Sequence, residues 1–353
     1  MKQKLSHSKL DLAQEHSHMF LADKHNFGQQ VEKVQRGSDT WYRKPRTVYW
    51  EWLFFGKTSP LKTLFNEKGE NGTRPLADYF FNLDIEVEGT WSGYAKEVST
   101  ESQTRTLEHF YAFGALIAYC YIFGIRDLHK QNLIMTKTHL QAVDAEVVFT
   151  ALTLPHETLL LPFKTVGYEF AGIGALVNSK ADPTQVQVEQ ILLGYWDLFS
   201  LVSNRKVEID GALAALDFSK MPIRVIIRNT SEYRNLLESP PDNILFSEIE
   251  QIRRGDVPFY FKFVRDKSLY WLKEKNLVQS EEFVKKFLTD IDRHAMYLPN
   301  IFSEKAVSES KFVTGTLFLI KHFDHSTDLR LSGQAKISQR KLVAFNREFH
   351  FTA

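Results

Sequence analysis

The pattern of hydrophobic and polar positions is clearest at the centre of the chain. Residues 101–123 have the apolar spacing of a helix, and the second half of this segment is apolar on almost every side, which predicts a buried helix. Gly124 ends the apolar run, a polar loop follows at 126–132, and a short strand is expected at 140–143. We expect the rest of the protein to be organised around this central segment, residues 110–149.

The first hundred residues predict a small mixed unit of strands and helices. Segments 32–35 and 40–44 alternate around a Gly-containing turn, which is typical of a β-hairpin. The elements expected after it are two helical segments at 48–55 and 61–65 and two strands at 83–87 and 90–98. Strands that precede a long buried helix in this way suggest a small lobe next to a larger one.

After the centre the pattern is less regular. The expected elements are an irregular, cleft-covering segment at 150–175, a helix at 186–203, a helix start near 229–230, and charged helical pieces with short strands such as 312–319. No repeat, low-complexity tract or linker marks off an independent second domain. We therefore expect one catalytic unit.

Composition excludes several classes of function. The 353 residues are 43% hydrophobic, enough for a large core, and 44 Lys and Arg against 43 Asp and Glu give a net charge of +1. This balance does not favour nucleic acid or an anionic membrane as a partner. Cys120, the single cysteine, lies in the apolar run, where we expect it buried; it cannot form an internal disulfide or a Cys-rich zinc site.

The chain shows no targeting segment or membrane span. Its N-terminus lacks the uninterrupted apolar core of a signal peptide. The longest uncharged stretch, 110–125, is shorter than the roughly 20 residues that cross a bilayer. We expect a cytoplasmic protein.

Candidate chemistry begins in the polar loop after the central helix. Asp127, Asn132 and Asp144 have the spacing of a kinase catalytic loop followed by a metal-binding loop. Phosphoryl transfer needs an acid near the attacking hydroxyl, and an Asn and an Asp to hold the magnesium ions that bridge the phosphates. His129 lies within the same loop, where it is either a structural hydrogen-bonding group or a catalytic one.

Two pairs of cations have an alternative, structural explanation. Lys44 ends the second hairpin strand, where Pro45 stops the ladder, and a strand-borne lysine facing a cleft can hold ATP phosphates. Position alone favours the alternative, that Lys44 and Arg46 are ordinary surface cations. Arg224 and Arg228 could likewise be solvated side chains beside a helix start.

Six short motifs follow one another between residues 21 and 261. They are DKHNFGQQV at 23–31, YRKPR at 42–46, GYAKEV at 93–98, the Asp-Leu-His…Asn…Asp-x-Glu core within 127–149, RVIIRNTSEY at 224–233, and GDVPF at 255–259. In this order they resemble the dehydratase domain of LanM-type (class II) lanthipeptide synthetases. That resemblance implies an α+β, two-lobed, protein/lipid-kinase-like fold, with a small mixed N-lobe at 1–98 and a larger, mostly helical C-lobe at 99–353.

The resemblance also implies two reactions in one cleft. Such a dehydratase phosphorylates Ser or Thr of a ribosomally made precursor peptide with ATP and Mg²⁺, and then eliminates the phosphate to leave a dehydroamino acid. For phosphoryl transfer the implied residues are Lys44 on the ATP phosphates, Asp127 at the substrate hydroxyl with His129 beside it, and Asn132, Asp144 and Glu146 on magnesium. For elimination they are Asp23, His25, Arg224 and Thr230. Elimination requires a base for the α-proton, and a cation and hydrogen-bond donors for the departing phosphate. Arg224 and Thr230 also lie in a motif that follows the other motifs in the expected order, which favours a functional role for both over a structural one.

The chain also departs from this family. Its members carry an additional N-terminal region and a C-terminal cyclase whose zinc is bound by Cys and His, and a single cysteine cannot supply those ligands. We therefore expect a stand-alone dehydratase whose product is cyclised by a separate partner enzyme, or not at all. Gln29 stands where the family tends to have Arg, and residues 168–175 follow its activation-region pattern only loosely.

Two further readings remain open. One is a kinase that phosphorylates a hydroxyl substrate without eliminating phosphate. The other is a catalytically silent module that presents the precursor peptide, with its leader and its Ser- or Thr-containing core, to partner enzymes.

Overall fold

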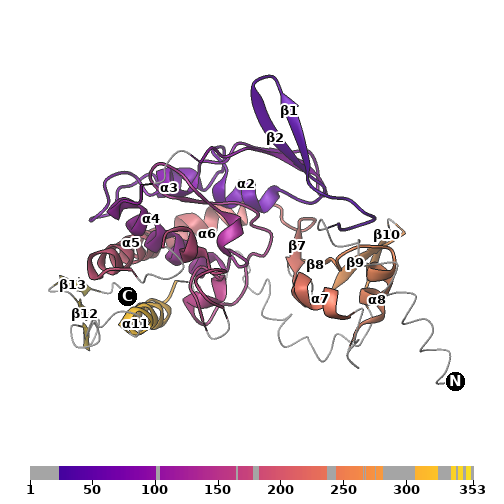
Figure 1. The fold of residues 1–353 in the computed structure, drawn as a ribbon. Helices are drawn as coiled ribbons and strands as arrows, with labels where there is room; N and C mark the ends of the chain where they lie inside the picture. The colour runs from indigo at the N-terminus through magenta and orange to yellow at the C-terminus, as the bar shows by residue number, and fades with distance from the viewer. Residues whose placement is uncertain are drawn as a thin grey trace.

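The computed structural model describes residues 24–100, 104–163, 166–177, 183–236, 244–264, 266, 268–274, 276–280, 307–324, 335–338, 341–344 and 347–350. Figure 1 shows the main helices on one side of the molecule, a hairpin that projects from the top, and a small sheet on the other side. Asp23 lies outside the described residues.

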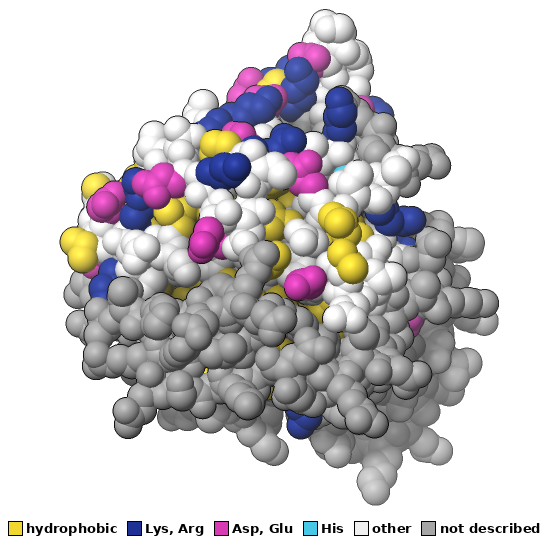
Figure 2. Space-filling view, turned by 90° about the vertical axis from the view of Figure 1, so that its left-hand side faces the viewer, with side chains coloured by type: hydrophobic (Ala, Val, Ile, Leu, Met, Phe, Trp, Pro, Cys, Tyr) yellow, Lys and Arg dark blue, Asp and Glu magenta, His cyan; other side chains and the backbone are white. Residues whose placement is uncertain are grey.

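The projecting hairpin belongs to an antiparallel sheet. Its strands are β1 (Glu32–Arg36), β2 (Asp39–Lys44), β3 (Ile85–Val87) and β4 (Gly93–Lys96), in the order β1-β2-β4-β3. Gly37 has a φ of 61° at the turn, which glycine adopts without strain. The predicted hairpin and the two later strands are confirmed. Basic and acidic side chains form ion pairs across this sheet. Figure 2 shows basic and acidic side chains intermixed in the upper part of the molecule, rather than a surface of one charge.

Two long helices form the centre of the main core. They are α4 (Leu107–Phe123), in which every residue from His109 onward is buried, and α5 (Gln185–Asn204). A Cβ on Gly114 would lie 1.8 Å from the Ile191 carbonyl oxygen, so glycine is what allows the two backbones to approach. The predicted helices are confirmed, although α4 begins six residues later than expected. Cys120 is buried as expected.

The remaining core elements surround this pair. They are α2 (Tyr49–Phe55), η1 (Lys62–Phe65), α3 (Ala77–Phe80), the β5 (Leu133–Met135) and β6 (Leu140–Ala142) hairpin, α6 (Lys206–Ala214) and α11 (Glu309–Asp324). The described residues within 150–175, which leave out 164 and 165, are irregular as predicted, apart from η3 (Pro155–Thr158) and η4 (Gly172–Ala175). Elements on both sides of the expected boundary at residue 98 share one hydrophobic cluster.

The small sheet and its helices form what we call the β7–β10 unit. Its elements are β7 (Pro222–Val225), α7 (Thr230–Leu236), α8 (Phe246–Arg253), β8 (Tyr260–Phe263), β9 (Tyr270–Lys273) and β10 (Asn276–Gln279). The antiparallel strand order is β10-β9-β8-β7, and the unit has two small hydrophobic clusters of its own. Figure 1 shows it beside the helical body, with β7 nearest to that body.

One predicted strand is wrong. Residues 312–319 lie within helix α11, whose buried Phe312, Leu319 and Phe323 pack into the main cluster. A short apolar run fits a buried helix as well as a strand, and helical contacts with the core decide the outcome. A separate three-stranded meander, β11 (Ala335–Ser338), β12 (Lys341–Ala344) and β13 (Arg347–His350), follows.

The fold class is therefore mixed α+β with several small antiparallel sheets. The likeness to a two-lobed kinase, and the division at residue 98, remain predictions. Within the described residues no helix combines the length and apolar character that crossing a membrane requires.

Candidate functional site

The predicted phosphate-binding lysine is buried against two acids. Lys44 ends β2 and is only 7% exposed; its Nζ lies 2.7 Å from Oε1 of Glu51 and 2.9 Å from Oδ1 of Asp144. Burial lowers the pKa of Lys44, and the negative charge of Glu51 opposes that shift. Because the chain turns directly from β2 into α2, a strand-borne lysine and a helix-borne glutamate meet. Lys44 is therefore not a surface cation.

Arg46 continues the same arrangement and is also buried. It forms ion pairs with Asp144 and, through Nε at 3.2 Å, with Glu146. The other carboxylate oxygen of Glu146 lies 2.7 Å from Nη1 of Arg224 in β7. The alternating charges run Glu51, Lys44, Asp144, Arg46, Glu146 and Arg224, which we call the ion-pair network. Burying this many charges is favourable only when each is paired, so the network fixes the relative positions of three segments.

The central loop is held next to this network by backbone contacts. The side-chain amide of Asn132 donates to the Asp127 carbonyl at 2.8 Å, and the Val143 N–H donates to the Asn132 carbonyl at 2.9 Å. Asp127 and Asp144 have φ values of 65° and 67°, a conformation that residues other than glycine rarely adopt. Such backbone outliers concentrate at functional sites. The structure thus brings Asp127, Asn132 and Asp144 onto adjacent segments.

Asp127 is electrostatically linked to Arg224 from the distant β7 strand. Burial raises the pKa of Asp127, while the positive charges of Arg224 and His129 act in the opposite direction. His129 itself accepts a hydrogen bond from the Gln131 N–H through Nδ1 at 3.3 Å, and its ring lies 5.0 Å from that of Phe170. His129 therefore has a structural contact, and a catalytic role for it stays a prediction.

The early His25 segment docks onto the GDVPF turn. The buried Asp256 carboxylate accepts the N–H groups of Phe27 and Gly28, each at 2.8 Å, and His25 Nδ1 lies 2.8 Å from the Val257 carbonyl oxygen. The motif at 23–31 and the motif at 255–259 therefore contact each other in the fold. Asp256 is the residue that joins them.

Phe259 connects this segment to Arg224. The Phe259 ring lies 5.3 Å from the His25 ring and 5.0 Å from the Arg224 guanidinium. Stacking of this kind favours a cation held over an aromatic face. The structure therefore brings His25 and Arg224 together through one aromatic side chain, while Asp23 lies outside the described residues.

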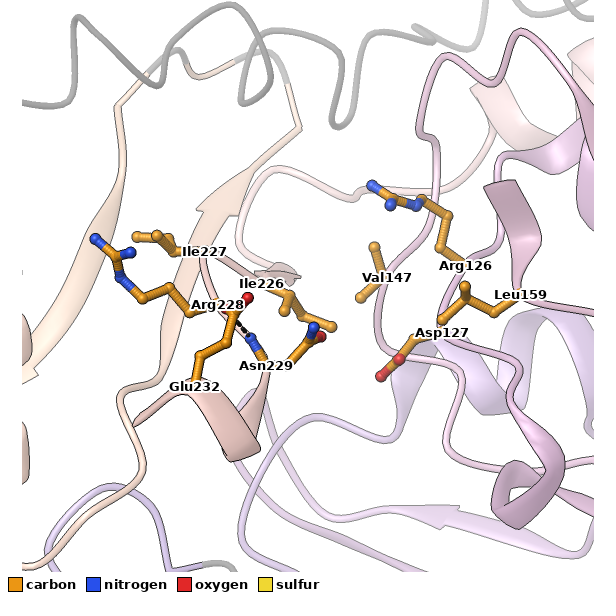
Figure 3. Close-up of a pocket in the computed structure, with 9 residues that line it drawn as sticks. All are labelled: Arg126, Asp127, Val147, Leu159, Ile226, Ile227, Arg228, Asn229 and Glu232. Carbon is orange, nitrogen blue, oxygen red and sulfur yellow. Dashed lines mark hydrogen bonds between the residues drawn. The ribbon is translucent and has the colours of Figure 1, made fainter. Parts of the chain in front are cut away.

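A pocket of about 210 Å³ lies between the central loop and the β7–β10 unit. Arg126, Asp127, Val147 and Leu159 line one wall, and Ile226, Ile227, Arg228, Asn229 and Glu232 line the other. Figure 3 shows the Asp127 carboxylate and the Asn229 carboxamide directed into the space between the walls. Thr230 begins α7 next to Asn229, whose N–H donates to Glu232 at 2.9 Å. Thr230 therefore lies beside the pocket in the chain.

Sequence reasoning missed the role of Glu51. This residue lies in the first turn of the helix that follows the lysine strand, and phosphotransferases use a strand lysine paired with a helix glutamate. A glutamate at the start of that predicted helix was the available signal. Asp256 and Phe259 lie in a motif that the sequence does contain, but only the fold reveals their contacts with residues 25–28 and 224.

The donor set around Asp144 fits a magnesium ion only with help from a ligand. No group of three His, Cys, Asp or Glu side chains suited to a metal occurs among the residues that the structure describes. Mg²⁺ is commonly held by one or two carboxylates together with water and substrate phosphates, which Asp144 and the neighbouring Asn132 could satisfy. Glu146 is 4% exposed with both oxygens in ion pairs, so its role as a ligand stays a prediction.

The comparison with known families gives one match. Residues 3–171 match a family described as a domain of unknown function (DUF4135). The match covers the ion-pair network up to Glu146 and the central loop, and it ends before the β7–β10 unit begins. No curated protein matches the sequence.

Proposed function

We propose that the protein is a LanM-like dehydratase that acts on Ser and Thr residues of a ribosomal precursor peptide. The matched domain is associated with LanM-like lanthipeptide synthetases. The observation that carries the proposal is the position of Glu146, which pairs with Arg46 on one side and Arg224 on the other. Glu146, which is proposed for phosphoryl transfer, therefore contacts Arg224, which is proposed for elimination.

The first step is phosphorylation of the peptide hydroxyl. Asp127 faces the pocket and accepts the hydroxyl proton while the oxygen attacks the γ-phosphorus and the bond to ADP breaks. Lys44 holds the phosphates from its buried position beside Glu51. Magnesium, held by Asn132 and Asp144, would neutralise charge on those phosphates.

The second step removes phosphate from the same residue of the peptide. A base from the Asp23 and His25 segment takes the α-proton, the Cβ–O bond breaks, and phosphate leaves with both electrons of that bond. Arg224 stabilises the charge that develops on the leaving group, and Thr230 donates a hydrogen bond to it. We place the reaction in the cytoplasm, where ATP and newly made peptides are available.

A kinase without elimination activity is the second candidate. The contacts among Lys44, Glu51 and Asp144 do not involve the β7–β10 unit, so phosphoryl transfer can operate without the residues proposed for elimination. This candidate retains ATP and Mg²⁺ as cofactors.

One incubation separates these functions. The protein is mixed with a precursor peptide encoded beside its gene, ATP and magnesium, and the peptide is analysed by mass spectrometry. Loss of one water per modified Ser or Thr supports the dehydratase, and gain of phosphate without loss of water supports the kinase. An unchanged peptide, together with no binding of ATP, would leave a silent peptide-binding module and reject both enzymatic functions.

A further inference from the structure

Arg46 carries a buried donor that its ion pairs do not use. Its side chain is about nine-tenths buried, with Nη2 on Asp144 and Nε 3.2 Å from Glu146. Among the described residues, its third nitrogen, Nη1, has no hydrogen-bond partner. A buried donor without a partner is costly, and native proteins keep one mainly where a ligand or a solvent molecule completes the site.

The unused nitrogen belongs to a side chain that shares Asp144 with Lys44, the predicted phosphate-binding lysine. Because a guanidinium is planar and rigid, Nη1 lies beside the nitrogen that contacts Asp144. Lys44 contacts the same carboxylate oxygen of Asp144. Arg46 and Lys44 thus reach the same carboxylate from one short segment of the chain.

Lys44 alone offers little to a polyphosphate. Its ammonium group has three donors, and Glu51 and Asp144 already engage it. The network contains three cations and three acids, so its charges balance, and a phosphate chain must be bound here through free N–H donors rather than through surplus positive charge. A second arginine donor answers this need, because guanidinium geometry matches phosphate oxygens.

We propose that Arg46 is a second phosphate-binding residue, which donates Nη1–H to the phosphates of a nucleoside triphosphate while its other nitrogens stay on Asp144 and Glu146. This inference rests on the proposed ATP-dependent function and adds a residue to it. Arg46 then has two roles at once, since it holds the two acids in place and binds the anion that they would otherwise repel.

Calorimetric titration with ATP and magnesium tests this role in the full chain. Arg46→Met should weaken ATP binding roughly 10- to 100-fold, the effect of losing a charge-assisted hydrogen bond and its charge, and Arg46→Lys about 10-fold. Arg43→Met is the matched control, because Arg43 lies on β2, three residues before Arg46, but is exposed, 3.4 Å from the exposed Glu32. Its affinity for ATP should equal that of the unchanged protein.

Adenosine separates phosphate binding from a purely structural role. If Arg46 binds phosphate, Arg46→Lys, which keeps a cation beside the two acids, loses much more affinity for ATP than for adenosine. Equal losses for adenosine and ATP, or ATP affinity unchanged in both Arg46 variants, would overturn the assignment of Arg46. Failure of the unchanged protein to bind ATP would instead reject the proposed function, and the Arg46 inference with it.

Discussion

The ion-pair network and the docked His25 segment position their residues by different means. In the network, charged side chains of residues 44–46, α2 and residues 144–146, most of them buried, hold one another through side-chain contacts. At the His25 segment, Asp256 instead holds the backbone N–H groups of Phe27 and Gly28, and His25 contacts a carbonyl oxygen. Side-chain charge fixes the first site, and backbone hydrogen bonds fix the second.

The contact between residues 146 and 224 joins the acids of the network to β7, and Phe259 joins β7 to the His25 segment. At the first of these contacts, a side-chain ion pair at 2.7 Å is joined by a backbone hydrogen bond of 3.2 Å from the Arg224 N–H to the Glu146 carbonyl. Removing the Glu146 carboxylate takes a charge partner from both Arg46 and Arg224, whereas removing Arg224 leaves Glu146 paired with Arg46. We therefore predict that a substitution on one side of this contact affects mainly one of the two reactions, whereas a substitution of Glu146 affects both.

Asp127→Asn should have the largest effect on activity. Loss of a general base lowers phosphorylation roughly 10²- to 10⁴-fold, measured as phosphate transferred to the peptide. Burial raises the pKa of Asp127, so protonated Asp127 favours the folded state. That contribution to stability is lost as the pH rises through the raised pKa, above which the ionised carboxylate opposes folding. Asn also tolerates positive φ. The unfolding midpoint at neutral pH should therefore not fall, and a lower midpoint would show that Asp127 mainly supports the fold.

Arg224→Gln should separate the two steps. Losing the cation at the leaving phosphate slows elimination about 10²- to 10³-fold, so phosphopeptide accumulates in the mass spectrum. Arg253→Gln is the control, because Arg253 is exposed on α8 of the same unit. Complete dehydration by Arg224→Gln would remove Arg224 from the elimination step.

Asp256→Asn should produce a smaller change of the same kind. It weakens the charge-assisted hydrogen bonds that hold residues 27 and 28, so elimination slows by about 10-fold while phosphorylation is retained. Hydrogen exchange at residues 24–29 should become faster. Unaltered exchange there would show that Asp256 does not hold the segment.

The pH dependence of phosphorylation is the finest test of the link between the regions. Because Asp127 must be ionised to accept a proton, activity is present above its pKa and lost as the pH falls through it, and burial places this loss at a higher pH than for an ordinary aspartate. Arg224 lowers that pKa, so Arg224→Gln should move the acid limb further upward. An acid limb that does not move would mean that Arg224 exerts no field at Asp127.

Periodicity and turn chemistry made the local elements predictable. The buried helix, expected at 101–123 and found at 107–123, and the hairpin at 32–44 both follow from the residue pattern, apart from the start of the helix. Burial of Lys44 and Arg46 could not be predicted from the residue pattern, because side chains at the end of a strand can be either buried or exposed. The strand expected at 312–319 failed because tertiary contacts, not local pattern, decide between a short strand and a buried helix.

Contacts between distant segments were predictable only in outline. The motifs implied that residues near 25, 127 and 224 belong to one site, but their spacing carries no distances. Glu51 starts a predicted helix and Phe259 lies in a quoted motif, but only the fold shows that Glu51 contacts Lys44 and that Phe259 contacts His25 and Arg224. The role of Asp23 stays a prediction.

Two reactions in one site can be tested directly with the phosphopeptide that Arg224→Gln is expected to accumulate. The purified phosphopeptide is incubated with Asp127→Asn, ADP and magnesium, and its conversion to dehydrated peptide is followed by mass spectrometry. If the two groups of residues divide the two steps, Asp127→Asn eliminates phosphate at a rate close to that of the unchanged protein, although it cannot phosphorylate. Loss of elimination in a folded Asp127→Asn protein would contradict that division.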